Sequence, residues 1–237
     1  IAGLLLSSRK IVDGINWAKT IANEGDAVPS LVEKGKSAFV GPEIEGKTLG
    51  VIGLGAIGVM VASTATHLGM NVLGYDPYIS VDAAWGLSRS VKKAPDLNTI
   101  FSESDYITLH VPLNNDTRGM INAETFKLMK KGVRILNFSR GELVNDDDLA
   151  AALNDGQVAC YVTDFPNAKT LNMPGVIAIP HLGASTPESD DNCAVYACNE
   201  LKNCLENGSI KNSVNFPTLE LPKTDLRRIC VIHKNIP

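Results

Sequence analysis

The sequence predicts an α/β protein built on a doubly wound parallel sheet, and three observations lead to this fold class. Short apolar runs alternate with helical stretches of about ten residues along the 237-residue chain, which indicates crossover units. The runs are nearly continuously apolar, as expected of strands that helices cover on both faces. A glycine-rich loop, GLGAIG, joins the first of these runs to a helical stretch.

The elements are expected in a regular order. An amphipathic helix covers residues 1–23, and a connection rich in Gly, Glu, Lys and Pro covers 24–46. Apolar runs predict strands at 48–54, 71–76, 106–113, 133–139, 158–165 and 175–181. Helical patterns between them predict helices at 56–70, 96–105, 122–132 and 146–156.

A long helix is expected after the last strand, over residues 185–208. Thr186 can cap it, Pro187 fits its first turn and Gly208 can end it. A Pro-punctuated linker follows over 209–226, and the run RRICVIH within 227–237 predicts the first strand of a further domain.

Composition excludes several classes of protein. The formal net charge of -4 argues against a nucleic-acid-binding protein, and no apolar run reaches the roughly 18 residues that a membrane span needs. The five cysteines are odd in number and contain no CxxC pair, so neither a disulfide framework nor a metal site is expected. Free thiols suit a reducing compartment, which predicts a cytoplasmic protein.

The glycine loop predicts a dinucleotide-binding fold of the Rossmann type. Gly53 allows a tight turn, Gly55 lets the backbone approach a pyrophosphate, and Gly58 lets the helix pack on the strand. Amides at the helix start, near Ala56 and Ile57, then face the phosphates. The second strand ends in Asp76, which can accept hydrogen bonds from the adenosine ribose hydroxyls. Its charge, with no Arg or Lys in the following DPYIS, favours NAD over NADP.

Two further side chains at predicted strand ends suit the oxidation of an alcohol. Arg140 follows the strand ending in NFS, and a guanidinium can bind a substrate carboxylate with two parallel hydrogen bonds. His181 ends the run GVIAIPH, and an imidazole can take the hydroxyl proton while hydride leaves to a nicotinamide. His110 ends another strand and is expected to line the cofactor site.

Several motifs together resemble the NAD-dependent D-2-hydroxyacid dehydrogenases: the glycine loop, HVPL, NFSRGELVN, TDF and PHLGAST. The similarity extends over nearly all of the chain. PHLGAST with the following PES is most similar to the members that oxidise 3-phosphoglycerate to 3-phosphohydroxypyruvate in the first step of serine synthesis. The tail RRICVIHKNIP is similar to the start of a small amino-acid-binding regulatory (ACT) domain, which supports those members.

The resemblance implies a domain plan and a site. Residues 1–23 become a crossover helix from a substrate domain absent here, 24–184 an NAD-binding Rossmann domain, 185–208 a return helix, and 227–237 a truncated ACT-like domain. The protein is expected to be a homo-oligomer, a dimer or a tetramer. Arg140 and His181 are the implied catalytic residues. The implied cofactor contacts are Gly53, Gly55, Ala56, Ile57, Gly58, Asp76, His110, Val111, Pro112, Thr117, Phe138, Ser139, Arg140, Asp164, His181, Gly183 and Ala184.

One position departs from the family pattern. The family places a Glu shortly after its Asp-containing strand, where it hydrogen-bonds the catalytic His. Here Asp164 is followed by FPNAKT, so that the Glu position holds Ala168 or Lys169, and a lysine would disfavour an imidazolium. Either catalysis is impaired or another acid substitutes. Two alternatives therefore stay open: a relative that acts on glycerate, lactate or formate, and an NAD-sensing module without catalysis.

Overall fold

The computed structural model describes residues 1–213, 215–222, 224, 227, 229 and 231, and the chain divides into two compact units. The first unit runs from Ile1 to Pro180 and contains the sheet; the second runs from His181 to Pro237. The strand and the ACT-like domain predicted over 227–237 fall mostly on residues outside the described ones.

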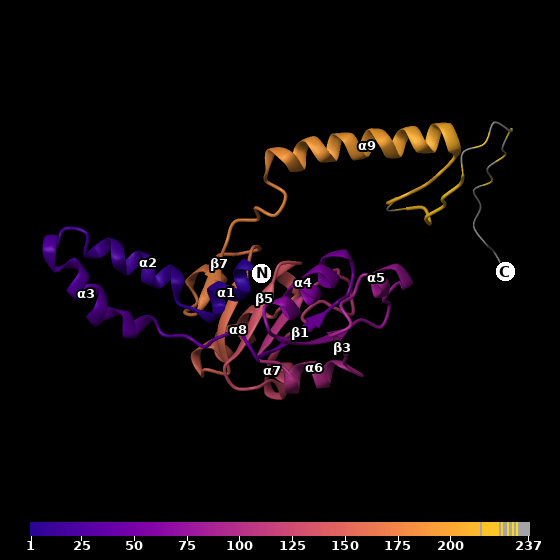
Figure 1. The fold of residues 1–237 in the computed structure, drawn as a ribbon. Helices are drawn as coiled ribbons and strands as arrows, with labels where there is room; N and C mark the ends of the chain where they lie inside the picture. The colour runs from indigo at the N-terminus through magenta and orange to yellow at the C-terminus, as the bar shows by residue number, and fades with distance from the viewer. Residues whose placement is uncertain (214, 223, 225–226, 228, 230, 232–237) are drawn as a thin grey trace. The chain divides into compact units, whose positions relative to one another are not determined.

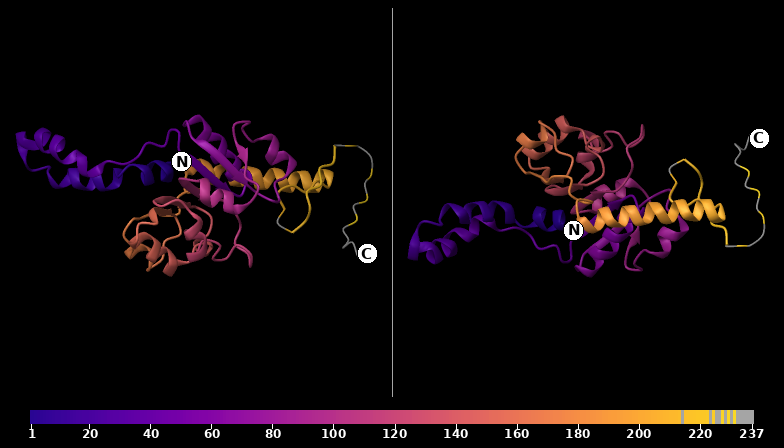
Figure 2. Two further views of the ribbon diagram at one scale, coloured as in Figure 1. Left: turned by 90° about the horizontal axis from the view of Figure 1, so that it is seen from below. Right: turned by 90° about the horizontal axis from the view of Figure 1, so that it is seen from above.

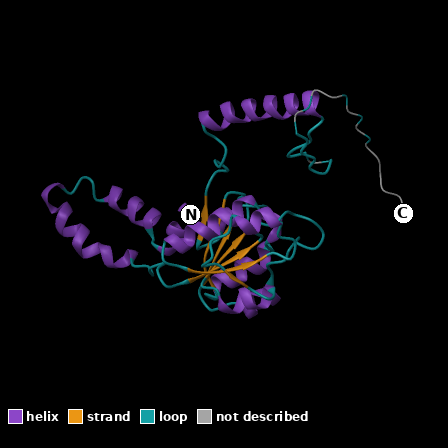
Figure 3. Cartoon of the chain, turned by 45° about the vertical axis from the view of Figure 1, so that its right-hand side comes forward, coloured by secondary structure: helices purple, strands orange, loops and turns teal. Residues whose placement is uncertain are grey.

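The first unit has the predicted doubly wound architecture. In the described part of the chain, parallel strands form a seven-stranded sheet in the order β3-β2-β1-β4-β5-β6-β7, with helices packed around it (Figure 3). The order reverses between β1 and β4, and ligands of such sheets bind in the crevice at this reversal. The strands are β1 (Thr48–Ile52), β2 (Asn71–Tyr75), β3 (Lys92–Lys93), β4 (Tyr106–Leu109), β5 (Val133–Asn137), β6 (Val158–Thr163) and β7 (Val176–Ala178).

The register of the central strands brings their carboxyl ends level with one another. Ile52, the last residue of β1, pairs with Tyr75 at the end of β2 and with Leu109 at the end of β4. Leu109 in turn pairs with Asn137 at the end of β5, which pairs with Thr163 at the end of β6. The loops that carry the predicted site residues therefore start from one edge of the sheet.

One face of the sheet packs against α1 (Ala2–Ser8) and α4 (Ala56–His67), which Figure 1 labels. Leu4 of α1 and the small residues Ala62 and Ala65 of α4 are buried against Leu49 and Val51 of β1. The small side chains on the buried side of α4 explain its close approach to the strand, because they leave little distance between helix and sheet.

The opposite face packs against α6 (Leu97–Glu103), α7 (Ala123–Leu128) and α8 (Asp146–Asn154). Each begins at a polar cap: Asp96 accepts a hydrogen bond from the Thr99 amide, Asn122 forms a capping box, and Asn145 accepts from two α8 amides. These helices confirm the predictions at 96–105, 122–132 and 146–156. The short helix α5 (Val81–Trp85) was not expected from the sequence.

The helix predicted over 1–23 is wrong, because the chain breaks it into two. Residue Arg9 is extended, so α1 ends at Ser8 and α2 (Ile11–Thr20) begins after Lys10. The Ser8 hydroxyl donates to the Pro42 carbonyl, and serine hydroxyls that bond backbone groups compete with helix continuation.

The expected connection over 24–46 is largely helical as well. It contains η1 (Gly25–Ala27), α3 (Val28–Gly35) and η2 (Lys36–Phe39). The Trp17 ring of α2 lies 5.3 Å from the Phe39 ring, centroid to centroid, and an added Cβ at Gly35 would overlap the Trp17 indole. Aromatic packing thus joins α2 to η2 and to the last residue of α3, within the indigo segment of Figure 2.

The second unit contains the expected long helix, α9 (Pro187–Asn207). The Thr186 hydroxyl accepts a hydrogen bond from the Ser189 amide, and Gly208 ends the helix with a left-handed φ of 70°. Ile210 and Leu219 then form an isolated antiparallel bridge. Among the described residues, no helix is both long enough and apolar enough to cross a membrane.

Candidate functional site: the carboxyl edge of the sheet

The glycine loop after β1 meets the expected steric demands. Gly53 has φ +93°, and a Cβ there would lie 2.6 Å from the His110 carbonyl oxygen. An added Cβ at Gly58 would overlap the Gly53 carbonyl oxygen. Gly55 is different, because no heavy atom lies within 4 Å of its would-be Cβ. Gly53 and Gly58 therefore serve the packing of the chain itself, whereas Gly55 leaves space above the loop for a ligand.

The start of α4 is open to such a ligand. Gly55 is its N-cap, and no side chain caps the first amides. Ala56 and Ile57 are exposed, with 61 % of Ile57 accessible. Uncapped amides at a helix N-terminus favour an anion. The loop and the helix start thus fit the pyrophosphate of a dinucleotide.

Asp76 ties the end of β2 to the glycine loop. Its Oδ2 accepts a hydrogen bond from the Leu54 amide at 2.8 Å, and its Oδ1 accepts one from the Tyr78 amide at 2.8 Å. The same residue lines a cavity of about 420 Å³ with apolar walls that include Ile79 and Leu87. An adenine ring fits apolar walls, and the fixed carboxylate fits the ribose hydroxyls.

Two cations in this cavity were missed at the sequence level. Lys92 and Lys93 of β3 line it together with Asp76, because Gly74 of β2 pairs with Lys93. The strand β3 consists of two lysines, so it lacks the apolar run from which the other strands were predicted. The expected preference for NAD over NADP therefore depends on the Asp76 charge, since cations that would accept a 2′-phosphate lie in the same cavity.

His110 follows β4 at the point where the strand order reverses. Burial lowers the pKa of His110 from 6.5 to about 4. Its Nε2 lies 3.0 Å from the Thr108 hydroxyl oxygen. His110 is therefore neutral at pH 7. Beyond Val111, the loop is closed by Thr117, whose hydroxyl donates to the Pro112 carbonyl at 2.6 Å.

This pKa predicts a loss of stability in mild acid. The unfolded state, with an ordinary histidine, takes up a proton below pH 6.5, whereas folded His110 does so only near pH 4. The free energy of unfolding should therefore fall by about 2 kcal/mol between pH 7 and pH 5. In urea titrations at both pH values, His110→Gln should remove this part of the fall, and His67→Gln, at an exposed histidine, should not. An equal pH dependence for wild type and His110→Gln would contradict the assignment.

Arg140 stands on a rigid turn after β5. The side-chain amide of Asn137, fully buried, donates to the Arg140 carbonyl at 2.8 Å, and the Ser139 hydroxyl donates to the Leu109 carbonyl at 2.8 Å. The Arg140 guanidinium is exposed and donates to the Ser139 carbonyl at 2.7 Å. Phe138 instead packs against the core on the α1 side. The turn therefore fixes the backbone that carries Arg140.

An aromatic side chain that was not anticipated supports this arginine. The Arg140 Cζ lies 5.5 Å from the Phe165 ring centroid, a cation–π arrangement. Phe165 follows Asp164 directly after β6. The motif TDF was therefore the only feature of the sequence that could have pointed to this aromatic side chain. The Asp164 Oδ1 is buried and has no hydrogen-bond partner among the described residues. A buried carboxylate oxygen without a partner suits a residue that binds a ligand.

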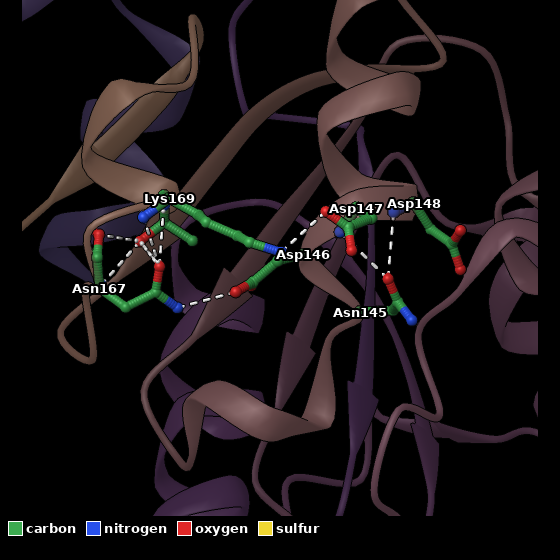
Figure 4. Close-up of polar contacts among 7 residues, drawn as sticks. Asn145, Asp146, Asp147, Asp148, Asn167 and Lys169 are labelled. Carbon is green, nitrogen blue, oxygen red and sulfur yellow. Dashed lines mark hydrogen bonds and ion pairs between the residues drawn. The ribbon is translucent and has the colours of Figure 1, made fainter.

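The loop after β6 is tied to the start of α8, as Figure 4 shows. Lys169 Nζ lies 2.9 Å from Asp147 Oδ1, and the Asn167 side-chain amide donates to Asp146 Oδ2 at 2.8 Å. The hydrogen bond and the charge of Asp147 raise the pKa of Lys169. Ala168, which lies between Asn167 and Lys169 in the sequence, is exposed. The Lys169 charge is therefore compensated by Asp147.

His181, Gly183 and Ala184 follow β7 along the chain and belong to the second unit. Their roles next to Arg140 stay a prediction.

Comparison with known proteins identifies the family. The sequence profile described as "D-isomer specific 2-hydroxyacid dehydrogenase, NAD binding domain" matches residues 2–183. The chain belongs to the D-isomer specific 2-hydroxyacid dehydrogenase family. Its NAD-binding domain carries the glycine loop, Asp76 and Arg140 described above, which agrees with the predicted cofactor.

Relatives and solved structures of the family agree with this assignment. D-3-phosphoglycerate dehydrogenase of Synechocystis sp. is 38% identical over 190 residues, which are 78% of this chain and 34% of that protein. The protein of the same name from Dictyostelium discoideum is 37% identical over 207 residues, 82% of this chain and 50% of that protein. Apo D-lactate dehydrogenase from Escherichia coli superimposes with a TM-score of 0.69 at 28% identity, over 86% of this chain and 62% of that one. The chain thus spans between a third and a half of the length of these two curated relatives.

Proposed function

We propose that this chain is the cofactor-binding part of an enzyme that oxidises 3-phosphoglycerate to 3-phosphohydroxypyruvate with NAD, the first step of serine synthesis. The main support is that the features expected of the site lie at the carboxyl edge of the sheet. There the open space over Gly55 and the fixed Asp76 lie at the ends of β1 and β2, and Arg140 follows β5. The relatives named D-3-phosphoglycerate dehydrogenase support the choice of substrate.

Each residue has a distinct task in the proposed reaction. The Arg140 guanidinium, supported by Phe165, binds the substrate carboxylate with two parallel hydrogen bonds. His181 takes the proton of the substrate hydroxyl as the carbon is oxidised. NAD, when bound, accepts the hydride. Asp164 offers a buried carboxylate oxygen as an acceptor for a polar group of the cofactor. We further propose that the protein acts in the cytoplasm as a homo-oligomer, a dimer or a tetramer.

A second candidate function is NAD sensing without catalysis. The observation in its favour is the loop after β6, where Ala168 is exposed and Lys169 is paired with Asp147, so neither supplies the family's carboxylate. In this case the protein would bind NADH and reduce no keto acid.

An assay of the complete protein separates these functions. We expect NAD-dependent oxidation of 3-phosphoglycerate in preference to glycerate, lactate and formate. His181→Asn should lower kcat by about 10² to 10⁴. Arg140→Gln should raise KM for the hydroxy acid. Binding of NADH without turnover of any acid in the panel would favour the sensing function instead.

A further inference from the structure

A small basic cavity opens at the amino-end edge of the sheet, opposite the edge that carries the glycine loop. Its walls come from residues at the starts of strands: Lys47 precedes β1, Asp105 precedes β4, and Arg134 lies at the start of β5. Lys130 and Lys131 complete its charged lining. Four basic side chains thus surround one carboxylate in a chain whose formal net charge is -4.

Arg134 is held in a fixed position in this basic cavity. Its Nε donates to the Ser7 carbonyl at 2.9 Å, and its Cζ lies 5.3 Å from the centroid of the Tyr106 ring. Tyr106 is completely buried, so the guanidinium rests on a rigid surface. A guanidinium carries five N–H donors, and a second of these donates to the Gly132 carbonyl at 3.4 Å. Donors therefore remain for a ligand.

Asp105 is held by the backbone and forms an ion pair with one of the lysines. Its Oδ2 accepts a hydrogen bond from the Thr48 amide at 2.8 Å, and its Oδ1 lies 3.1 Å from Lys130 Nζ. Burial acts to raise the pKa of Asp105, but the Thr48 amide and the charges of Lys130 and Lys47 outweigh it, so this pKa lies below its usual value. One carboxylate thus compensates part of the positive charge and fixes Lys130.

The other basic side chains have only this carboxylate to share among the residues that line the cavity. None of the ion pairs formed by the described residues includes Lys47, Lys131 or Arg134. The excess is three positive charges around a volume of about 140 Å³. This volume is the share of roughly five water molecules in the liquid, enough for a phosphate group and too little for a nucleotide.

We propose that the basic cavity binds a phosphate group, either as free phosphate or as the end of a small phosphomonoester. A doubly charged tetrahedral oxyanion matches three excess charges and several preplaced N–H donors better than a single carboxylate does. Because the basic cavity lies at the amino ends of the strands, its ligand and the dinucleotide at the carboxyl ends can bind together. The proposal does not depend on the proposed function.

Isothermal titration with inorganic phosphate tests this site in the complete chain. NADH is present at saturation, so that phosphate cannot occupy the glycine loop, and chloride keeps the ionic strength constant. We expect saturable binding that Lys47→Gln/Lys131→Gln weakens by about tenfold, since two charges at the cavity are removed. The matched control, Lys19→Gln/Lys34→Gln, removes the same charge from exposed positions on α2 and α3 and should leave the affinity unchanged.

A second arm replaces phosphate with glycerol phosphate, and tighter binding of this ester would assign the site to a phosphomonoester. The absence of saturable phosphate binding would overturn the proposal. Equal weakening by both double variants would overturn it too, because the effect would then follow total charge and not the basic cavity. Circular dichroism melts of both variants establish that each is folded.

Discussion

Ala168→Glu is expected to raise kcat of the complete protein by about a hundredfold. The family's glutamate hydrogen-bonds the catalytic histidine, and a carboxylate in that place holds the imidazole and stabilises its protonated form. Ala168 is exposed and lies one residue before the lysine that pairs with Asp147, so a new carboxylate there replaces no contact of the fold. Steady-state kinetics as a function of pH measure the effect.

Lys169→Glu serves as the contrasting variant. It would set a carboxylate against Asp147, now 2.9 Å from the lysine nitrogen, and should give a smaller gain or none. In Ala168→Glu the acidic limb of the kcat profile should also move to higher pH, because the glutamate raises the pKa of its histidine partner. Unchanged turnover in both variants would show that neither position is that of the family's glutamate.

Gly55→Ala is expected to weaken NADH binding on the order of a hundredfold, or about 2.7 kcal/mol, with little loss of stability. The would-be Cβ meets no atom of the protein, and φ −71° with ψ −167° is ordinary for alanine. Alanine is a poorer N-cap than glycine, which costs about 1 kcal/mol at most. The methyl group would instead meet the pyrophosphate. Calorimetric titration with NADH and urea denaturation measure the two effects.

Gly58→Ala is the matched control for this prediction. Its Cβ would overlap the Gly53 carbonyl oxygen, so the free energy of unfolding should fall by about 2 kcal/mol along with the affinity for NADH. Gly55→Ala should therefore lower the affinity for NADH alone, whereas Gly58→Ala should lower both the affinity and the free energy of unfolding. Wild-type affinity in Gly55→Ala would mean that no ligand approaches the loop there.

The fold and one half of the site could be predicted because their signals are local. Apolar runs and turn residues place the strands, and GLGAIG needs only its own neighbours to predict a turn with Gly53 at positive φ. Asp76 is recognisable because it ends a strand at the expected distance from the glycines. The glycines and Asp76 all belong to one βαβ unit, so their spacing along the sequence is enough to predict their arrangement.

The other features depend on contacts that the sequence does not reveal. Lys169 and Asp147 are 22 residues apart and meet only because β5 and β6 are neighbours in the sheet. Lys92 joins the Asp76 cavity through its pairing with β2. The break after Ser8 occurs where the Ser8 hydroxyl donates to the Pro42 carbonyl, which belongs to a segment distant in the sequence. Each of these features depends on a tertiary contact, which the local sequence pattern does not predict.

The amides at the start of α4 and the Asp76 carboxylate are expected to bind one dinucleotide together. Calorimetric titration of the wild-type chain with NADH, and then with NADPH, measures this binding. We expect saturable binding of one NADH per chain and much weaker binding of NADPH, because the Asp76 carboxylate repels a 2′-phosphate. No saturable binding of NADH would mean that the first βαβ unit is not a dinucleotide site, and equal affinity for both cofactors would mean that Asp76 does not face the adenosine ribose.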